Sequence, residues 1–191
     1  MGILNDIAKK QRTNSEDVLN EIIYRWSPKI MNGEEVSDED LTPLFEAARW
    51  APSSNNNQEW QFYYATKSQK SFEKLFNILF EGNKKWSKNA GALIVLISKK
   101  RSDYKEKPIN THSFDTGMAF QNFAIEGIRR DMVVRPMGGF DKKLAHKILD
   151  LNEKQHIECM ISVGRIGDIS LFKGVELSQR NNQETFAFKI D

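Results

Sequence analysis

The sequence of 191 residues contains a single cysteine, Cys159, and this scarcity excludes several kinds of site. An intrachain disulfide, a cysteine-rich zinc centre and a Cys-x-x-Cys redox pair all need more than one thiol. Cys159 lies in an apolar segment with the pattern of a strand, so we expect a buried small side chain rather than a nucleophile. A chain without disulfides suits a reducing compartment, and we expect a cytoplasmic protein.

Long hydrophobic runs and an excess of one charge are also absent. The longest apolar run, 90–97, is far shorter than the roughly 18 residues of a membrane-spanning helix. The N-terminus lacks the basic and apolar regions of a signal peptide. The 28 Lys and Arg residues nearly balance 26 Asp and Glu residues, and they are spread along the chain. We therefore expect no membrane span and no nucleic-acid-binding surface.

Motifs of several enzyme classes are missing as well. The chain has no Gly-x-Ser-x-Gly, no P-loop and no Gly-x-Gly-x-x-Gly, so hydrolysis through a serine elbow and nucleoside triphosphate chemistry lack support. The three histidines, His112, His146 and His156, lie far apart without the spacing of metal ligands. We expect them at the surface or in loops rather than as ligands or bases, and we expect no metal site.

What the sequence does contain is an alternation of helix and strand patterns, which predicts an α+β domain with a helix-covered sheet. Ser37 and Ser68 are predicted to cap two of the helices, and Gly82-Asn83 to end the second of these. Apolar stripes predict helices at 3–10, 16–24, 37–48, 68–79, 113–129 and 141–150. Strand patterns occur at 61–65, 92–97, 132–134 and 158–163, and the second, apolar at every position, should be central.

The chain has no internal repeat, low-complexity tract or long linker. We therefore predict one domain over residues 1–191, with N-terminal helices within 1–24 and an extended tail at 165–191.

The segment Arg25-Trp26-Ser27-Pro28-Lys29 places two cations and a hydroxyl at alternate positions. Pro28 favours an extended backbone at Ser27, and alternate side chains of an extended chain share a face. Such a face would bind a phosphate through charge-assisted hydrogen bonds. The alternative is a solvated loop after a helix, where exposed basic residues are common.

The segment 51–60 contains two hydroxyls and four carboxamides between a predicted helix and a predicted strand. Carboxamides donate and accept at once, so they match the mixed edge of a heterocycle without adding charge. A turn-rich loop explains the same composition. A third segment, 136–140, holds a glycine pair whose backbone N–H groups could approach a planar ligand. Here the alternative is a turn into a helix capped by Asp141.

In this order the segments resemble the nitroreductase family of FMN-dependent oxidoreductases, over about residues 24–180. Residues 25–29 resemble the family's Arg-x-Ser-x-Arg/Lys motif, and 48–60 resemble its Ala-Pro-Ser-Ser-x-Asn-x-Gln-Pro-Trp block, which is the most specific match. Later segments are similar to further family blocks: 86–90, 112–119, 138–141, Val163-Gly164 and Arg180. The departures are Glu59 for the usual Pro, Gly138 where many members have Glu, and Ser178 where some carry a second basic residue.

The resemblance implies an α/β sandwich with a mostly antiparallel central sheet, assembled as an intertwined homodimer with FMN at the subunit interface. It assigns Arg25, Trp26, Ser27, Lys29 and Arg180 to the phosphate and ribityl chain; Pro52, Ser53, Ser54, Asn56 and Gln58 to the flavin of the other subunit; and Pro136, Met137, Gly138 and Gly139 to the ring. Trp26 would act mainly through its backbone. Whether Asn83 also contacts the ring is left open.

The implied activity is hydride transfer from NADH or NADPH through FMN to a nitroaromatic, a quinone or a similar conjugated acceptor, by a ping-pong mechanism. No catalytic side chain is expected, because the flavin carries the chemistry. Two alternatives stay open. One is another flavin reaction on the same fold, such as dehalogenation or ene reduction, and the other is a non-catalytic dimer that binds or stores flavin.

Overall fold

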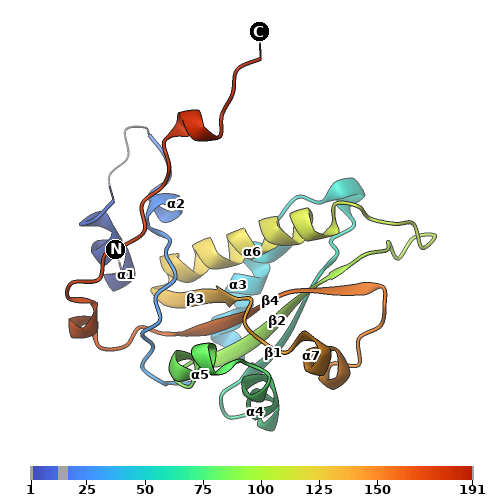
Figure 1. Ribbon diagram of the computed structural model, residues 1–191, viewed down its shortest axis with the longest axis horizontal. Helices are drawn as coiled ribbons and strands as arrows, with labels where there is room; N and C mark the ends of the chain where they lie inside the picture. The colour runs from blue at the N-terminus through green and yellow to red at the C-terminus, as the bar shows by residue number, and fades with distance from the viewer. Residues whose placement is uncertain (1, 13–16, 191) are drawn as a thin grey trace.

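The computed structural model describes residues 2–12 and 17–190. Its four strands form one antiparallel sheet in the order β1-β2-β4-β3 (Figure 1). The strands are β1 (Trp60–Thr66), β2 (Ala92–Lys99), β3 (Met132–Met137) and β4 (Gln155–Arg165). The α-helices are α1 (Ile3–Lys9), α2 (Asn20–Tyr24), α3 (Asp38–Arg49), α4 (Lys70–Asn77), α5 (Glu81–Ser87), α6 (His112–Arg129) and α7 (Lys142–Ile148). Single 3-10 turns are η1 (Ser54–Asn56), η2 (Ile169–Phe172) and η3 (Gln183–Thr185).

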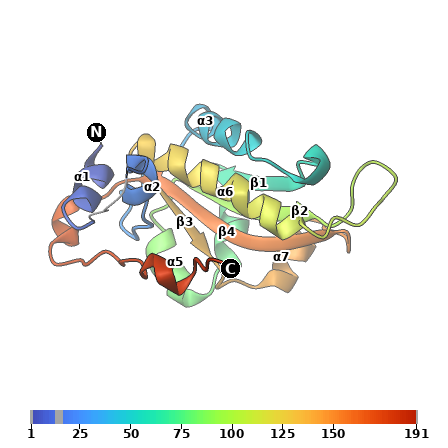
Figure 2. The ribbon, with the colours of Figure 1, turned by 90° about the horizontal axis from the view of Figure 1, so that it is seen from above.

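Helices cover both faces of the sheet, which confirms the predicted α+β sandwich. Strand β2 is central, and its residues 92–98 are all buried, as a strand between two helical layers requires. One face packs against α3 and α6 through Leu44, Ile94 and Phe123. The other packs against the remaining helices through residues such as Leu75 and Val95. Figure 2 shows α3 and α6 on one side of the sheet and α5 and α7 on the other.

Three predicted helix boundaries are wrong. Helix α2 begins only at Asn20, whereas the prediction began at Glu16, which lies outside the described residues. The cap of α4 is Gln69, because the Ser68 hydroxyl instead donates to the Glu35 carboxylate at 2.5 Å. Gly82-Asn83 do not end a helix but lie within α5, which the sequence did not predict. The Asn83 amide is held by a contact distant in sequence, described below.

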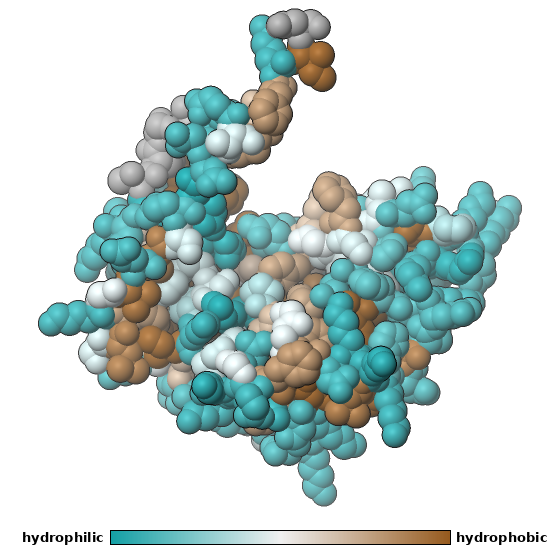
Figure 3. Space-filling view, in the orientation of Figure 1, coloured by the Kyte–Doolittle hydropathy of each residue, from teal (hydrophilic) through white to brown (hydrophobic). Residues whose placement is uncertain are grey.

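The chain after β4 turns through η2 and runs back beside α1 and α2 (Figure 1). Gln11 fastens this tail, because its amide donates to the Val175 carbonyl at 2.9 Å and accepts from the Leu177 N–H at 2.8 Å. The last described residues stand away from the body as an arm with exposed apolar side chains, Phe186 and Phe188 among them (Figure 3). Within the described residues, no helix has the length and apolarity to cross a membrane.

Candidate functional site

A basic cleft of about 440 Å³ lies between the chain before α3 and the C-terminal tail. Of the predicted phosphate-binding residues, Arg25, Ser27 and Lys29 line it together with Arg180, which comes from the tail. The Trp26 side chain is occupied elsewhere: it is 8% exposed, its indole N–H donates to the Leu4 carbonyl at 3.2 Å, and its ring packs edge-on against Phe172. Trp26 therefore offers the cleft mainly its backbone.

The cations of this cleft repel one another without compensation. Burial lowers the pKa of the Arg25 guanidinium, and the charge of Arg180 lowers it further. Burial also lowers the pKa of Arg12, with Arg180 and Arg25 adding to the shift. Within the part of the chain that the structure describes, none of these three arginines forms an ion pair, although Glu176 lines the same cleft. An anion bound here would relieve the repulsion and accept charge-assisted hydrogen bonds.

Arg135 connects the cleft to the end of β3. Its guanidinium donates to the Ser27 carbonyl and lies 5.1 Å from the centre of the Trp86 ring. Its Nε is buried and has no hydrogen-bond partner among the described residues. Since Arg135 directly precedes Pro136, it places the Pro136–Gly139 segment next to the cleft.

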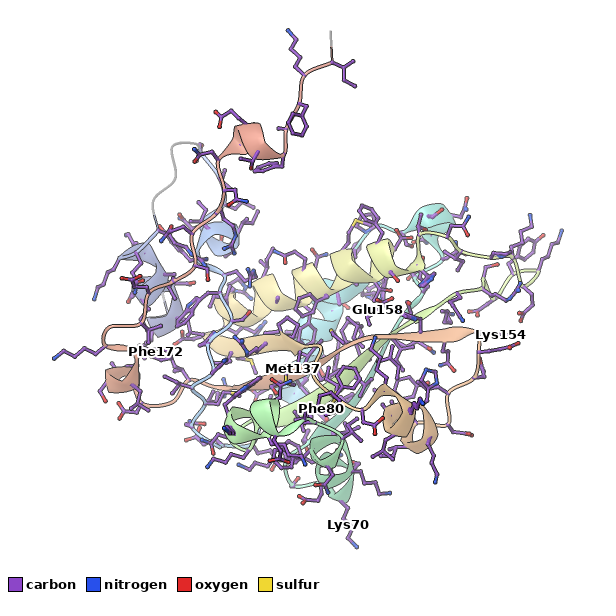
Figure 4. The ribbon with its side chains drawn as sticks, viewed as in Figure 1. Lys70, Phe80, Met137, Lys154, Glu158 and Phe172 are labelled. Carbon is purple, nitrogen blue, oxygen red and sulfur yellow. The ribbon has the colours of Figure 1, made fainter. Side chains whose placement is uncertain are left out.

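The Pro136–Gly139 segment offers backbone rather than side chains. Met137 is 4% exposed, with its sulfur against the Ser87 hydroxyl at 3.5 Å. The Gly139 carbonyl accepts from the Phe80 N–H at 3.1 Å and from the Asn83 amide at 2.9 Å, and Figure 4 shows Phe80 near Met137. Gly138 is open, because a Cβ there would meet nothing within 4 Å. Asn83 thus holds the loop in place.

The carboxamide-rich loop 52–58 has a strained backbone held by a buried acid. Asn55, Asn56 and Gln58 have φ of 53°, 54° and 50°, the left-handed region that Asn tolerates better than most residues. The Ser54 N–H donates to the Asp115 carboxylate at 2.9 Å. Farther along, the Gln58 N–H donates to the Ser53 hydroxyl at 3.0 Å. Pro52, Asn56 and Gln58 are exposed and free to contact another molecule.

This loop and the basic cleft lie at opposite ends of the molecule (Figures 1 and 2). The loop is attached to Asp115 in the first turn of α6, whereas α1 and α2, beside the cleft, contact α6 as well. The helix has 18 residues and therefore spans about 27 Å. The structure brings Arg25, Arg180 and the Pro136–Gly139 segment to one region but leaves the loop 52–58 apart from them.

Glu59, which replaces the family's Pro, is a buried acid behind the loop. Its side chain is 0% exposed, and neither carboxylate oxygen has a hydrogen-bond partner among residues 2–12 and 17–190. Burial raises the pKa of Glu59 to about 7, the negative charge of Asp115 adds to the shift, and Lys99 opposes it. For Asp115, burial works against ionisation, but hydrogen bonds from Ser54 and Thr111 outweigh it and lower the pKa.

Replacing Glu59 with Gln should change how stability depends on pH. The unfolded chain ionises Glu59 near 4.5, while the folded protein keeps the proton up to about 7. Stability from the protonated acid is therefore present below 4.5 and lost as pH rises to about 7. Urea unfolding of both proteins at several pH values should show the wild type losing stability relative to Glu59→Gln across this window. Parallel stability curves would contradict the buried position of Glu59.

Two residues of the site lack any local sequence signal. Arg12 comes from the end of α1 and reaches the tail 166 positions away, so no spacing pattern could have revealed it. Arg135 interrupts an otherwise apolar strand directly before Pro136, and this interruption is a signal that could have found it.

The histidine prediction needs a correction. His112 and His156 are close in space, with ring centres 5.9 Å apart, because β4 passes the start of α6. A β-bulge at Glu158 turns this carboxylate toward them, and the Ser98 hydroxyl donates to it at 2.5 Å. Among the described residues no group of three or more His, Cys, Asp or Glu could hold a metal ion. Cys159 is half-buried, and burial raises the pKa of its thiol to about 12, so it stays protonated.

Comparisons with known proteins give a consistent result. The model of the nitroreductase family matches residues 22–88 and 81–165. No curated protein matches the chain. Among solved structures, an oxidoreductase containing FMN is 33% identical over 93% of this chain and 94% of that one, with a TM-score of 0.86.

Two more distant structures share the fold. A putative nitroreductase in complex with FMN from Desulfovibrio desulfuricans is 20% identical, with a TM-score of 0.74 over 93% of this chain and 99% of that one. A second such complex, from Exiguobacterium sibiricum 255-15, is 16% identical, with a TM-score of 0.76 over 94% and 100%. The family match covers more than half of the sequence, and the 33% identical structure extends along nearly all of it. The chain belongs to the nitroreductase family.

Proposed function

We propose that this protein is an FMN-dependent oxidoreductase that uses NADH or NADPH to reduce a nitroaromatic, a quinone or a similar conjugated acceptor by a ping-pong mechanism. The observation that carries the proposal is the basic cleft, in which Arg25 and Arg180 repel each other without an ion-pair partner among the described residues. Support comes from the family membership and from the 33% identical relative that contains FMN.

The residues of the cleft fit a flavin phosphate. A phosphate dianion matches more than one cation, and guanidinium groups bind two of its oxygens at once. In this proposal Arg25, Lys29 and Arg180 neutralise the phosphate, Ser27 adds a hydroxyl, and Trp26 contributes its backbone. The buried Nε of Arg135, which lacks a partner in the described chain, is a further donor next to this group.

The isoalloxazine ring would lie along the Pro136–Gly139 segment, which adjoins the cleft. Bound FMN would supply the redox chemistry, taking a hydride from the nicotinamide and passing the electrons to the acceptor. The role of the chain is to position the ring, through the backbone of Met137, Gly138 and Gly139, and to leave one face open to flat substrates. Asn83 supports this arrangement by holding the Gly139 carbonyl. No side chain of the chain is assigned as acid or base.

We further propose a homodimer in which the loop 52–58 of one copy reaches the flavin of the other. This accounts for the separation of loop and cleft along α6 in one chain. It also gives the arm with Phe186 and Phe188 a surface to cover, because apolar side chains this exposed usually meet a partner. A cytoplasmic location suits an enzyme that draws on NADH or NADPH.

A turnover assay tests the proposed activity. The FMN-loaded protein is supplied with NADH or NADPH and a panel of nitroaromatics, quinones, halogenated aromatics and conjugated enones. We expect acceptor-dependent oxidation of one nicotinamide, with parallel lines in a double-reciprocal analysis, as a ping-pong mechanism gives. Turnover of halogenated compounds or enones alone would replace the acceptor class. Bound FMN without turnover of any acceptor would favour a flavin-binding or flavin-storage protein.

A further inference from the structure

Arg12 joins the two chain segments that carry the cations of the cleft. Its Nη1 donates to the carbonyl of Ile23 at 2.7 Å and to the carbonyl of Arg25 at 2.8 Å. Its Nη2 donates to the carbonyl of Ser178 at 3.2 Å, two residues before Arg180. One guanidinium from the end of α1 therefore fixes the backbone at Arg25 and close to Arg180.

The neighbouring residue performs a similar attachment without a charge. Gln11 exchanges hydrogen bonds with Val175 and Leu177, and its carbonyl accepts from the Gln179 amide at 3.1 Å. A neutral amide is thus sufficient to hold the tail against α1. If Arg12 had only this task, its positive charge would be a disadvantage.

The charge of Arg12 is unfavourable in the structure as it stands. Arg12 is half-buried, and after burial itself, the charges of Arg180 and Arg25 are what lower its pKa. Among the described residues it forms hydrogen bonds to carbonyl groups but no ion pair with a carboxylate. Three guanidinium groups at one cleft become favourable when an anion with several oxygens binds between them.

We propose that Arg12 is a positioning residue of this anion site: it aligns Arg25 and Arg180 and adds a third positive charge, so that the cleft binds a phosphate monoester. The phosphate group of FMN is the ligand if the proposed function holds, and in that respect the inference rests on it. The recognised chemistry is the phosphate itself, so inorganic phosphate is a second probe that does not depend on flavin.

The test compares Arg12→Gln, which keeps N–H donors but removes the charge, with Gln11→Ala, which loosens the tail without changing any charge. Equilibrium titrations measure the dissociation constants of FMN and riboflavin, which differ by the phosphate. Thermal unfolding with phosphate or chloride at equal ionic strength measures binding of inorganic phosphate. Arg101→Gln, on the loop after β2, controls for a general loss of positive charge.

We expect Arg12→Gln to weaken FMN binding about tenfold or more, the effect of a lost charge-assisted interaction, and to change riboflavin binding less than about twofold. It should also remove most of the gain in Tm that phosphate gives the wild type. Arg12→Lys, which keeps the charge, should restore part of both effects, and this rescue also serves if Arg12→Gln folds poorly. Gln11→Ala and Arg101→Gln should keep the wild-type preference for FMN over riboflavin.

Equal losses for FMN and riboflavin, or the same loss in Gln11→Ala, would overturn the inference and leave Arg12 with a purely structural role. A wild type that gains no stability from phosphate and binds no FMN would overturn it as well. A wild type that is stabilised by phosphate through Arg12 but takes up no FMN would retain the inference and overturn the proposed function.

Discussion

Replacing Arg25 with Ala should weaken FMN binding by about 1.5 to 3 kcal/mol, the range for a hydrogen bond to a charged group, which is about 10- to 150-fold. The effect should be large because Arg25 is half-buried, so water cannot easily substitute for the lost guanidinium. The unliganded protein should not lose stability, because the substitution also removes the repulsion between Arg25 and Arg180. Flavin titration measures the affinity, and thermal unfolding of the FMN-free protein measures the stability.

A matched control is Arg49→Ala, at the end of α3. Arg49 is an exposed arginine whose partner, Glu46, lies on the same helix, so its loss should leave FMN binding unchanged. Wild-type retention of FMN by Arg25→Ala after extensive dialysis would mean that this arginine does not bind the phosphate. A fall in the Tm of the unliganded variant would show that the repulsion with Arg180 is not present in the folded protein.

Two defective variants should restore FMN sites when they are combined. Arg25→Ala disables the phosphate end of a site, and the double variant Asn56→Gly/Gln58→Gly disables the loop. Glycine suits both loop positions because it adopts positive φ without strain. If the loop of one copy serves the flavin of the other, a mixed dimer has one intact site and one doubly defective site. Random mixing should then make about a quarter of all sites intact.

FMN content of the mixed sample, after the subunits have been exchanged through mild denaturation, gives the answer. Each variant alone should bind little flavin at a concentration that saturates the wild type. Recovery in the mixture requires a site built from two chains. No recovery, with light scattering showing dimers in every sample, would mean that each chain completes its own site. A monomeric wild type that binds FMN fully would contradict the shared site as well.

The parts of the fold that the sequence predicted correctly are those decided over a few residues. Ser37 caps α3 through a reciprocal pair of 3.2 Å hydrogen bonds with Asp40, and Asp141 caps α7 by accepting from the Leu144 N–H. Both partners lie three positions away, so the pattern was visible in the sequence. The apolar run of β2 was equally clear, because burial on two faces leaves no room for polar side chains.

The boundary of α5 shows why other elements were missed. Gly82 and Asn83 are typical of a helix end, and local propensity favours that interpretation. In the structure, however, the Asn83 amide is held by the Gly139 carbonyl, 56 positions away. This contact occupies the side chain that would otherwise disturb the helix, and no local pattern records it. Tertiary contacts therefore override propensity at this point.

The candidate site divides in the same way. Arg25, Ser27 and Lys29 were predicted to share a face, and all three line the cleft, because the alternation is a local property of extended backbone. Arg12 could not be predicted, since it enters through the fold of the tail across α1. Whether the loop 52–58 serves a second chain was equally closed to local reasoning, because it depends on where the two ends of α6 lie.

Anaerobic reduction of the reconstituted protein tests the central claim most directly. The purified chain is incubated with FMN, freed of excess cofactor and titrated with NADH and with NADPH while its visible absorbance is recorded. We predict about one FMN per chain, loss of the flavin absorbance with at least one nicotinamide, and its return on addition of a nitroaromatic or a quinone. A chain that takes up no FMN, or whose bound FMN neither nicotinamide reduces, would contradict the account.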